Sequence, residues 1–389
     1  MISVDEALAQ IFALLAPLGA ETVPLAQAAG RVLAHPVRAA RAQPPFPAAS
    51  MDGYALAGDP RPGAVFHIVG EAAAGRAFGG SLAPGTAVRI LTGAPVPEGA
   101  TRVVMQEDVH LQGDRIVLAA RLDGRTHIRP AGVDFGIGAE VAAPRRLRPA
   151  DLALLAAMNI AEVSVTRRPD VALIATGDEL VMPGEIPRDD QIIASNIFAL
   201  RAMIEAEGGR ARVLPIARDT APALRMAFDL AEGADLIVTI GGASVGDHDL
   251  VARIGEELGL RRAFYKIAMR PGKPLIAGTL NGVPMLGLPG NPISAIVCGH
   301  LFLLPALRAL LGLGCHPAAM QTGRLAGPVG PNGQRAHYMR ARLTDAGIAP
   351  MDQQDSSLLS VFAQADALLL RPAGDGARAP GELVEYLPI

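Results

Sequence analysis

The residues of this chain that are best suited to chemistry follow an apolar stretch, Leu236–Ile240, of the kind found in strands buried on both faces. The next residues, Gly241–Asp249, read GGASVGDHD and combine small residues with acids. Glycines allow backbone N–H groups to approach a bound group closely, and Asp247 and Asp249 could hold a metal ion. Taken alone, this loop fits a tight turn with solvated acids equally well, because glycine-rich turns are common.

Two further polar loops are expected at the same edge of the sheet. The loop Thr176–Glu179 follows the apolar stretch Val171–Ala175, and the loop Pro289–Pro292 follows Val283–Leu288. Since the carboxyl ends of parallel strands meet at one edge, the three loops would lie side by side. Three glycine-containing polar loops at one edge favour a functional site over three unrelated turns.

An anion site is predicted beside these loops. Asn291 can cap a helix that begins at Pro292, so the N–H groups of the helix start would face the edge of the sheet, and Ser294 adds a hydroxyl group. Three cations lie close together just upstream: Lys266, Arg270 and Lys273. Cations beside a helix start suit an oxyanion or a phosphate, although the alternative is that these cations form a solvated basic turn. The spacing of a Walker A loop is missing.

The same edge is expected to hold a cation, because carboxylates and a bound anion would otherwise repel each other. Glu179, Asp247 and Asp249 are hard oxygen ligands of the kind that Mg²⁺ prefers, and Mg²⁺ commonly bridges carboxylates and phosphates. These residues predict a phosphorylated or nucleotidyl ligand held through Mg²⁺, with a second oxyanion near Arg270 and Lys273. No arrangement of a serine or cysteine nucleophile with histidine is visible. The residues alone do not identify the substrate.

The composition is that of a folded multidomain protein. The chain has 389 residues, of which 50% are hydrophobic and 19% are charged, so several domains are expected. The net charge of −3 argues against a general nucleic-acid-binding protein. The absence of tryptophan argues against surfaces that stack on bases.

The cysteines, the N-terminus and the longest apolar run favour a cytoplasmic protein. Cys298 and Cys315 suffice for neither a disulfide framework nor a zinc site, which favours a reducing compartment. The first residues, MISVDEALAQ, lack the basic start of a signal peptide. The apolar run Ser294–Gly314 is interrupted by His300 and Arg308, so we expect a core helix and no membrane span.

The first part of the chain predicts a β-rich insertion between helical pieces. Ser3 and Glu6 fit a capping box at the start of a helix, and a second helical piece is expected at Leu25–Ala34. A proline-rich break at Gln43–Pro47 marks a boundary, and Arg148–Met158 predicts another helix. Short strands are expected between these pieces, at Val65–Val69, Ala87–Leu91, Arg102–Gln106 and Arg115–Leu118.

From Asp170 the pattern alternates between strands and helices, which predicts a doubly wound parallel sheet. Asn281 and Gly282 predict a hairpin with a type I′ turn, and Ile293–Leu311 predicts a closing helix. Strands are expected at Val171–Ala175, Arg212–Ile216 and Leu236–Ile240, and helices at Ser195–Glu207, Asp219–Ala231 and Asp249–Leu258. The last part predicts a small all-β domain with strands at Thr322–Leu325, Ala336–Leu343, Ile348–Pro350, Ala367–Leu370 and Leu383–Leu387.

With these residues in view, the chain resembles the MoeA family of molybdopterin molybdenumtransferases, which is related to the E domain of gephyrin and to its plant counterpart. The motifs that carry the resemblance occur in family order over almost the whole chain. They are Pro45–Phe46, Ser50–Ala55, Leu91–Pro97, Thr176–Leu180, Gly241–Asp247, Arg270–Pro274 and Gly287–Pro292.

The resemblance implies an activity and an architecture. The activity is the Mg²⁺-dependent insertion of molybdate into adenylylated molybdopterin, with release of AMP and molybdenum cofactor. The architecture is a multidomain α/β fold, in which a MogA-like doubly wound domain would span residues 169–315. An elongated helical dimerisation domain (1–43 and 139–168), a β-rich insertion (44–138) and a C-terminal β-barrel (316–389) would complete it.

The resemblance also implies partners. A homodimer is expected, with a cleft that combines the α/β domain of one subunit with the β insertion of the other. Transient contact with a molybdopterin adenylyltransferase is expected too, and neither nucleic acid nor membrane is.

Matching positions then acquire roles. The catalytic set is Asp52, Glu179, Asp249 and Lys266, and the metal ligands are Glu179, Asp247 and Asp249. Contacts to the phosphate, the molybdate or the pterin are expected from Asp219, Gly241, Gly242, Ser244, Gly246, Lys266, Arg270, Lys273, Pro289, Asn291, Pro292 and Ser294. Thr92 and Asp134 would approach from the β insertion together with Asp52, and Arg340 and Ser356 would close the molybdate side.

Three positions depart from the family pattern. Pro47–Ala49 stands where an acidic–polar pair is frequent, Arg270 stands where some members have lysine, and Asp355 stands where glycine is usual. Two other functions use similar modules: a scaffold like the gephyrin E domain, and an adenylyltransferase or CinA-like pyrophosphatase built on the same α/β core.

Overall fold

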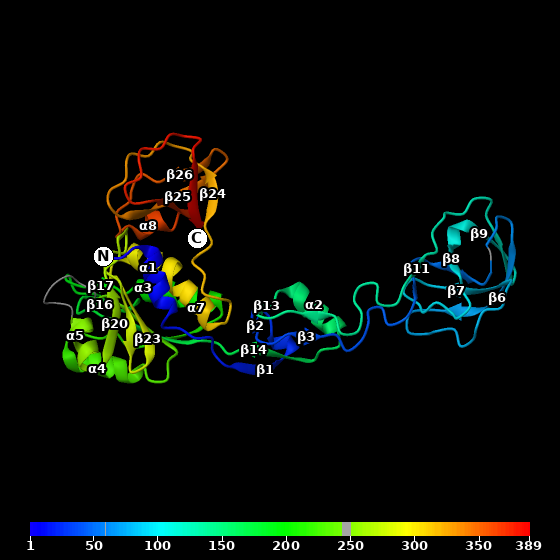
Figure 1. Ribbon diagram of the computed structural model, residues 1–389, viewed down its shortest axis with the longest axis horizontal. Coiled ribbons are helices and arrows are strands. Elements are labelled where there is room, and N and C mark those ends of the chain that lie inside the picture. The colour runs from blue at the N-terminus through cyan, green and yellow to red at the C-terminus, as the bar shows by residue number, and fades with distance from the viewer. Residues whose placement is uncertain (59, 243–249) are drawn as a thin grey trace.

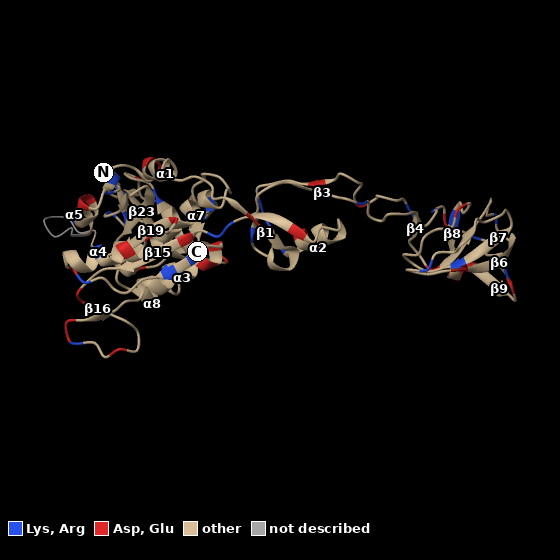
Figure 2. Cartoon of the chain, turned by 90° about the horizontal axis from the view of Figure 1, so that it is seen from below, with Lys and Arg blue, Asp and Glu red and all other residues tan. Residues whose placement is uncertain are grey.

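The computed structural model describes residues 1–58, 60–242 and 250–389 (Figure 1). Ser244, Gly246, Asp247 and Asp249, all predicted site residues, lie outside the described residues. The chain forms an extended molecule, with the two termini near one end and a β-rich unit at the other (Figure 1). Acidic and basic residues are interspersed along its length (Figure 2).

The α/β unit contains a six-stranded mixed sheet in the order β18-β15-β19-β23-β22-β20. The first four strands in this order are parallel, whereas β22 and β20 run antiparallel to their neighbours. The expected hairpin is confirmed, since Asn281 and Gly282 have φ angles of 50° and 86° between β22 and β23. The strands are β15 (Asp170–Ala175), β18 (Arg210–Val213), β19 (Leu236–Ile240), β20 (Leu260–Tyr265), β22 (Ile276–Leu280) and β23 (Val283–Leu288).

Helices cover the sheet on both faces, as a doubly wound fold requires. The expected end of α3 at Glu207 is confirmed, because the next residue, Gly208, caps the helix in the left-handed conformation, with φ of 101°. The closing helix runs from Pro292 to Leu310 and includes a π-helical segment, Gly299–Leu303. The helices are α3 (Asn196–Glu207), α4 (Ala221–Leu230), α5 (Leu250–Glu257), α6 (Pro292–Cys298) and α7 (Leu304–Leu310).

The closing helix lies in the core. It is the one described helix that is long and apolar enough to cross a membrane, but 83% of it is buried inside the protein, as in a core helix. The N-terminal helix α1 (Val4–Phe12) packs in the same core through Ala7, Leu8 and Ile11, although its sequence position placed it with the elongated domain. The capping box at its start is confirmed: Ser3 Oγ accepts from the Glu6 N–H, and the Glu6 carboxylate accepts from the Ser3 N–H.

The middle unit connects the α/β unit to the distal unit. Its sheet has the order β1-β14-β2-β13, and α2 (Pro149–Ala157) packs beside it. The helix predicted at Leu25–Ala34 is wrong: only a 3-10 turn, Leu25–Gln27, is present. Gly30 adopts φ of 71°, which a helix does not allow, and the following residues pair as a strand instead. The strands of this unit are β1 (Ala20–Pro24), β2 (Val32–Leu33), β3 (Val37–Arg38), β12 (Glu140–Val141), β13 (Arg145–Arg146) and β14 (Glu162–Thr166).

The distal unit is the β-rich insertion, and two chain segments join it to the rest of the molecule (Figure 1). Its main sheet has the order β8-β5-β7-β6-β10-β9, and the four strands expected in this region are confirmed. Its strands are β4 (Ala48–Ala49), β5 (Gly53–Leu56), β6 (Val65–Ala72), β7 (Thr86–Ile90), β8 (Arg102–Met105), β9 (Val109–Gln112), β10 (Arg115–Leu118) and β11 (Ile128–Arg129).

The C-terminal unit lies on the α/β unit and is mainly β, but it also contains a short helix that the sequence did not predict, α8 (Leu359–Phe362) (Figure 1). Its sheet has the order β21-β25-β27-β28-β24, and the short strand β21 (Met269–Arg270) comes from the α/β unit. This pairing fastens the two units to each other. The other strands, all near their expected positions, are β24 (Gln321–Arg324), β25 (Ala336–Thr344), β26 (Gly347–Pro350), β27 (Ala367–Arg371) and β28 (Leu383–Pro388).

Candidate functional site

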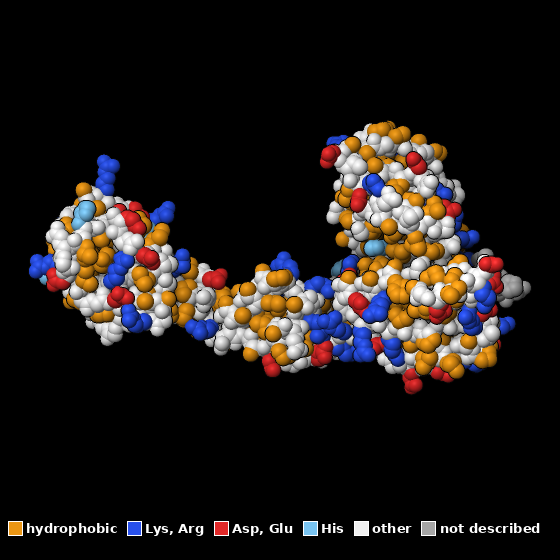
Figure 3. All heavy atoms as spheres, turned by 180° about the vertical axis from the view of Figure 1, so that it is seen from behind, with side chains coloured by type: hydrophobic (Ala, Val, Ile, Leu, Met, Phe, Trp, Pro, Cys, Tyr) orange, Lys and Arg blue, Asp and Glu red, His pale blue; other side chains and the backbone are white. Residues whose placement is uncertain are grey.

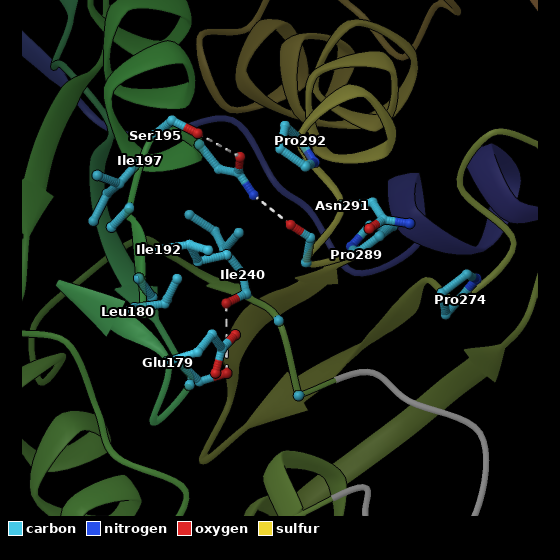
Figure 4. Close-up of a pocket in the computed structure, with 18 of the residues that line it drawn as sticks. Glu179, Leu180, Ile192, Ser195, Ile197, Ile240, Pro274, Pro289, Asn291 and Pro292 are labelled. Atoms are coloured by element: carbon cyan, nitrogen blue, oxygen red, sulfur yellow. Dashed lines mark hydrogen bonds between the residues drawn. The ribbon is translucent and has the colours of Figure 1, made fainter. Parts of the chain in front are cut away.

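A cavity of about 750 Å³, here called the main cavity, opens where β15, β19 and β23 end. Residues that directly follow these three strands line it together, as parallel strands require. In Figure 4 Glu179 lies on one side of the cavity and Pro274 on the opposite side. Of the predicted site residues, the wall includes Glu179, Asp219, Gly241, Gly242, Lys266, Lys273, Pro289, Asn291 and Pro292.

Two glycines bring the loop after β19 close to its neighbour. Gly241 and Gly242 have φ angles of 92° and 67°, which side chains rarely adopt. A Cβ atom on Gly241 would lie 2.7 Å from the carbonyl oxygen of Thr176, and one on Gly242 would overlap with Val251 of α5. The chain therefore needs glycine at both positions to make the wall of the main cavity.

Carboxylates gather on one side of this cavity. Burial raises the pKa of Asp219, and the negative charges of Asp178 and Glu179 raise it further. The Asp219 N–H donates to Asp178 Oδ1 over 3.1 Å, which holds the two loops together. This concentration of negative charge favours a cation beside it. Within the described ranges no group of three or more histidine, cysteine or acidic residues is close enough to hold a metal ion.

Two lysines face the same cavity from the segment between β20 and β22. Lys266 has φ of 76°, an uncommon and strained value for a residue with a side chain. Its Nζ lies 4.6 Å from the centre of the Tyr265 ring, which favours a cation–π interaction. Lys273 lines the cavity as well. Strained residues are concentrated at functional sites, so Lys266 is a strong candidate for contact with a ligand.

The start of the closing helix offers fewer free N–H groups than its sequence suggests. Asn291 does not cap the helix through its side chain, and its Nδ2 donates to Ser356 Oγ over 3.2 Å. Pro292 has no N–H, and the Ile293 N–H donates to the carbonyl oxygen of Ser356 over 3.1 Å. Ser294 is buried, with 4% exposure. The helix start therefore has fewer free N–H groups for an anion than predicted. The two hydrogen bonds to Ser356 also join the helix to the C-terminal unit.

Arg270 does not line the main cavity. It lines a second cavity, of about 510 Å³, on the C-terminal unit, where its Nη2 lies 2.9 Å from His337 Nδ1. Arg340 is 1% exposed, and its guanidinium donates to the carbonyl oxygen of Gln353 over 2.8 and 3.2 Å. Arg340 thus holds the loop that carries Ser356 and is not on the wall of either cavity.

Of the three residues predicted on the β insertion, Asp52 precedes β5 and Thr92 follows β7 in the distal unit, which lies far from the α/β unit of the same chain (Figure 1). Asp52 Oδ1 accepts hydrogen bonds of 2.7 Å from both the hydroxyl group and the N–H of Thr92. These bonds lower the pKa of Asp52, so its carboxylate stays charged. Asp134 is exposed in the connection between β11 and β12, where its N–H donates to the Gln43 carbonyl oxygen over 3.0 Å. One chain therefore does not bring Asp52, Thr92 or Asp134 to the main cavity.

Sequence reasoning missed the apolar side of the main cavity. These side chains come from the segment between β15 and α3, which contains the short strands β16 (Leu180–Val181) and β17 (Ile192–Ile193), and a loop that stands away from the unit joins them (Figure 2). Asn196 Nδ2 donates to the Gly290 carbonyl oxygen over 2.7 Å and closes this side. The segment begins with the predicted loop Thr176–Glu179, but no motif marks its isoleucines. The apolar residues on this side of the cavity are Leu180, Ile192 and Ile193 of the segment and Ile197 of the first turn of α3.

Comparison with known proteins gives a consistent result. The chain matches the profiles of the MoeA N-terminal region (domain I and II) at residues 2–159, a probable molybdopterin binding domain at 172–309, and the MoeA C-terminal region (domain IV) at 322–389. A molybdopterin molybdenumtransferase of Nostoc is 34% identical over 95% of this chain and 89% of its own length. One from Haemophilus influenzae is 32% identical over 100% of this chain and 98% of its own.

The fold comparison agrees. The crystal structure of a molybdopterin biosynthesis moeA protein from Pyrococcus horikoshii aligns with a TM-score of 0.85 and 30% identity, covering 100% of this chain and 99% of that one. A molybdenum cofactor biosynthesis protein from Pyrococcus furiosus aligns over the full length of both chains with a TM-score of 0.60 and 20% identity, which shows the same fold.

Proposed function

Because the chain belongs to the MoeA family of molybdopterin molybdenumtransferases, transferases of molybdenum cofactor biosynthesis, we propose that its main cavity inserts molybdate into adenylylated molybdopterin and releases AMP. The observation that carries this proposal is the pairing of charges on one cavity at the strand ends. Glu179 and Asp219 lie on the same wall as Lys266 and Lys273. A substrate with a phosphoanhydride and a second, tetrahedral anion needs both signs of charge.

The carboxylate side suits Mg²⁺. Burial, and then the negative charges of Asp178 and Glu179, raise the pKa of Asp219, and a hard divalent cation would relieve the repulsion among these carboxylates. Glu179 would be one ligand, and Asp247 and Asp249, outside the described residues, would supply others. When bound, Mg²⁺ would offset the charge of the phosphoanhydride and polarise the phosphorus.

The chain's own residues would bind and orient the two substrates. Lys266 and Lys273 would offset the charge on the phosphate or the molybdate. Gly241 and Gly242 allow the backbone to approach the phosphate closely. The apolar side of the main cavity would accept the flat pterin ring and exclude water from it. It is formed by Leu180, Ile192, Ile193 and Ile197.

The proposal includes a homodimer. Asp52, Thr92 and Asp134 are absent from the wall of their own chain's main cavity, and the distal unit lies far from the α/β unit (Figure 1), so they would reach a main cavity only from a second copy. The extended shape of the molecule suits this arrangement, because the distal unit projects well beyond the α/β unit. In the proposed dimer each site combines one chain's α/β unit with its partner's distal unit.

Release of AMP tests the proposal. The purified protein is given adenylylated molybdopterin and Mg²⁺, with and without molybdate, and AMP is measured over time. We expect AMP release that depends on molybdate and on Mg²⁺. Equal release without molybdate would contradict the insertion reaction and favour a simple hydrolase.

Lys273→Ala tests the site. The variant removes a cation from the main cavity without touching the core, so we expect turnover to fall at least about tenfold, the loss of one charge-assisted contact, at an unchanged melting temperature. The matched control is Arg225→Ala, which removes a cation from the ion pair with Glu257 on the outer helices and should keep the wild-type rate. Wild-type turnover in Lys273→Ala would remove this lysine from the site.

A further inference from the structure

Arg270 lines a different cavity from the two other cations of its segment. Lys266 and Lys273 line the main cavity, whereas Arg270 lies between them in sequence and lines the second cavity. The cause is the strand β21, which pairs in parallel with β25 so that Arg270 lies opposite His337. The segment thus separates the two cavities and presents cations to both.

His337 lies where β25 of the C-terminal unit pairs with β21 of the α/β unit. Its side chain is 6% exposed, and its Nδ1 lies 2.9 Å from Nη2 of Arg270, which is itself exposed. A guanidinium only donates, so Nδ1 must be the acceptor and the ring carries its proton on Nε2. Both backbones are held by the strand pairing, so the bond joins two fixed positions across the units.

The surroundings keep this ring neutral. Burial, and then the positive charges of four arginines, together lower the pKa of His337 to about 3; the arginines are Arg270, Arg340, Arg371 and Arg335. A neutral ring retains its acceptor nitrogen over the whole physiological range. The second cavity also has an acidic residue on its wall, Asp352.

We propose that His337 is a positioning residue for Arg270: by accepting from one N–H, it orients the guanidinium so that its other N–H groups face a tetrahedral oxyanion. Orientation matters here because a guanidinium is planar and donates only in its own plane, whereas a lysine ammonium rotates freely. A chain that carries arginine at this position therefore needs a fixed acceptor beside it. This inference rests on the proposed function, in which molybdate is a substrate, and it adds that Arg270 contacts this oxyanion from the second cavity.

The test compares three changes of His337. Asn places its oxygen near the position of Nδ1, Gln places its amide near the position of Nε2, and Leu has no acceptor. The measurements are the KM for molybdate and kcat in AMP release, together with molybdate binding to the protein alone by calorimetry. For Leu and Gln we expect the KM and the dissociation constant to rise about tenfold, as for one lost bond to a charged group, with kcat within about twofold. Asn should restore values near those of the wild type.

A double-mutant cycle with Arg270→Ala separates positioning from a structural role. If His337 acts through Arg270, His337→Gln adds nothing to the loss already caused by Arg270→Ala. Additive losses, or equal losses for Asn and Gln, would overturn the inference. The matched control is Arg342→Ala, which removes a cation on the same strand that bonds Gln364 outside both cavities and should leave the molybdate constants unchanged.

The two proposals fail in different ways. Molybdate binding that is the same in the wild type and Arg270→Ala overturns the role of His337, even when AMP release depends on molybdate. Absence of molybdate-dependent AMP release in the wild type overturns the proposed function. Calorimetry with molybdate alone, on folded variants with wild-type melting temperatures, then still decides on His337.

Discussion

At the scale of single residues, Lys266 combines a strained backbone with a charge on the main cavity. Its φ of 76° suits glycine far better than any residue with a Cβ. We therefore expect Lys266→Gly to be more stable than Lys266→Ala by about 1 kcal/mol, because only glycine relieves the strain. Both variants lose the same cation and should lose turnover equally. Thermal unfolding and AMP release measured on the pair check this prediction.

The comparison of the two variants is its own control. Both remove the cation–π contact with Tyr265, so that contact cancels in the difference. Equal melting temperatures would mean that the backbone at this position is relaxed. Retained turnover in either variant would mean that the charge does not serve the reaction.

A second residue, His300, links stability to pH. Burial, and then the charge of Arg308, lower its pKa to about 4, below the ordinary value of 6.5. Between these two values the unfolded chain binds a proton that the folded chain does not, so acidification favours unfolding. Stability should fall by about 1 kcal/mol for each pH unit between pH 6.5 and 4.5 on account of this group.

The variant His300→Gln removes the titrating group and isolates its effect. Unfolding midpoints in urea, measured at pH 7.0, 6.0 and 5.0, should decline less steeply in the variant than in the wild type. His337, whose pKa is also lowered, is present in both proteins and cancels. Parallel declines would show that His300 is not held neutral in the fold.

The candidate site could be predicted from sequence where loops follow strands. Glu179, Gly241 and Asn291 were placed at one edge because parallel strands end together, and they do line one cavity. Arg270 could not be placed, because its direction depends on a pairing with β25 that is remote in sequence. The direction of the Arg340 side chain could not be predicted either, because its hydrogen-bond partner is a backbone carbonyl oxygen whose position depends on how the following loop folds.

At the scale of elements, the loop after β19 depends on the packing of α5. A Cβ on Gly242 would overlap with Val251, so Gly242→Ala must push α5 away or move the loop. We expect it to lower the free energy of unfolding by about 1–3 kcal/mol beyond the cost of a positive φ, and to reduce turnover. The unfolding midpoint and the rate of AMP release measure the two effects.

The matched control is Gly282→Ala in the turn between β22 and β23. Its φ of 86° imposes a similar backbone cost, but a Cβ there meets nothing within 4 Å. It should therefore lose about 1 kcal/mol and keep its turnover. Equal losses in the two variants would mean that α5 yields to the added methyl group without cost.

Elements with a strong local pattern could be predicted, and those without one could not. The hairpin at Asn281–Gly282 and the end of α3 at Glu207 follow from local backbone preferences and are confirmed. The strand β20 was not predicted. It lies at the edge of the sheet, exposes its arginines and contains a bulge, so apolar and polar residues do not alternate regularly along it. The expected helix at Leu25–Ala34 was wrong because strand pairing prevailed over local helix preference.

At the scale of the whole molecule, ion pairs fasten the middle unit to the α/β unit. Glu207, at the end of α3, pairs with Arg146 of the middle unit and with Arg308 of the closing helix. Figure 3 shows basic side chains gathered where these two units meet. Glu207 is largely buried, so these pairs are less screened by salt than surface pairs. The junction therefore helps to set the direction in which the distal unit projects.

That direction matters because the proposed reaction needs groups from two chains. Asp52 lies on the distal unit and Lys273 on the main cavity, so a variant at each position should be inactive as a homodimer. A mixed dimer of Asp52→Ala with Lys273→Ala has one site that carries both intact residues and one site that lacks both. Such dimers, isolated through two different affinity tags on co-expressed chains, should therefore regain about half of the wild-type rate, since one of two equivalent sites works. A site contained within one chain would leave the mixed dimer inactive, and failure of the two tags to purify together would contradict the homodimer itself.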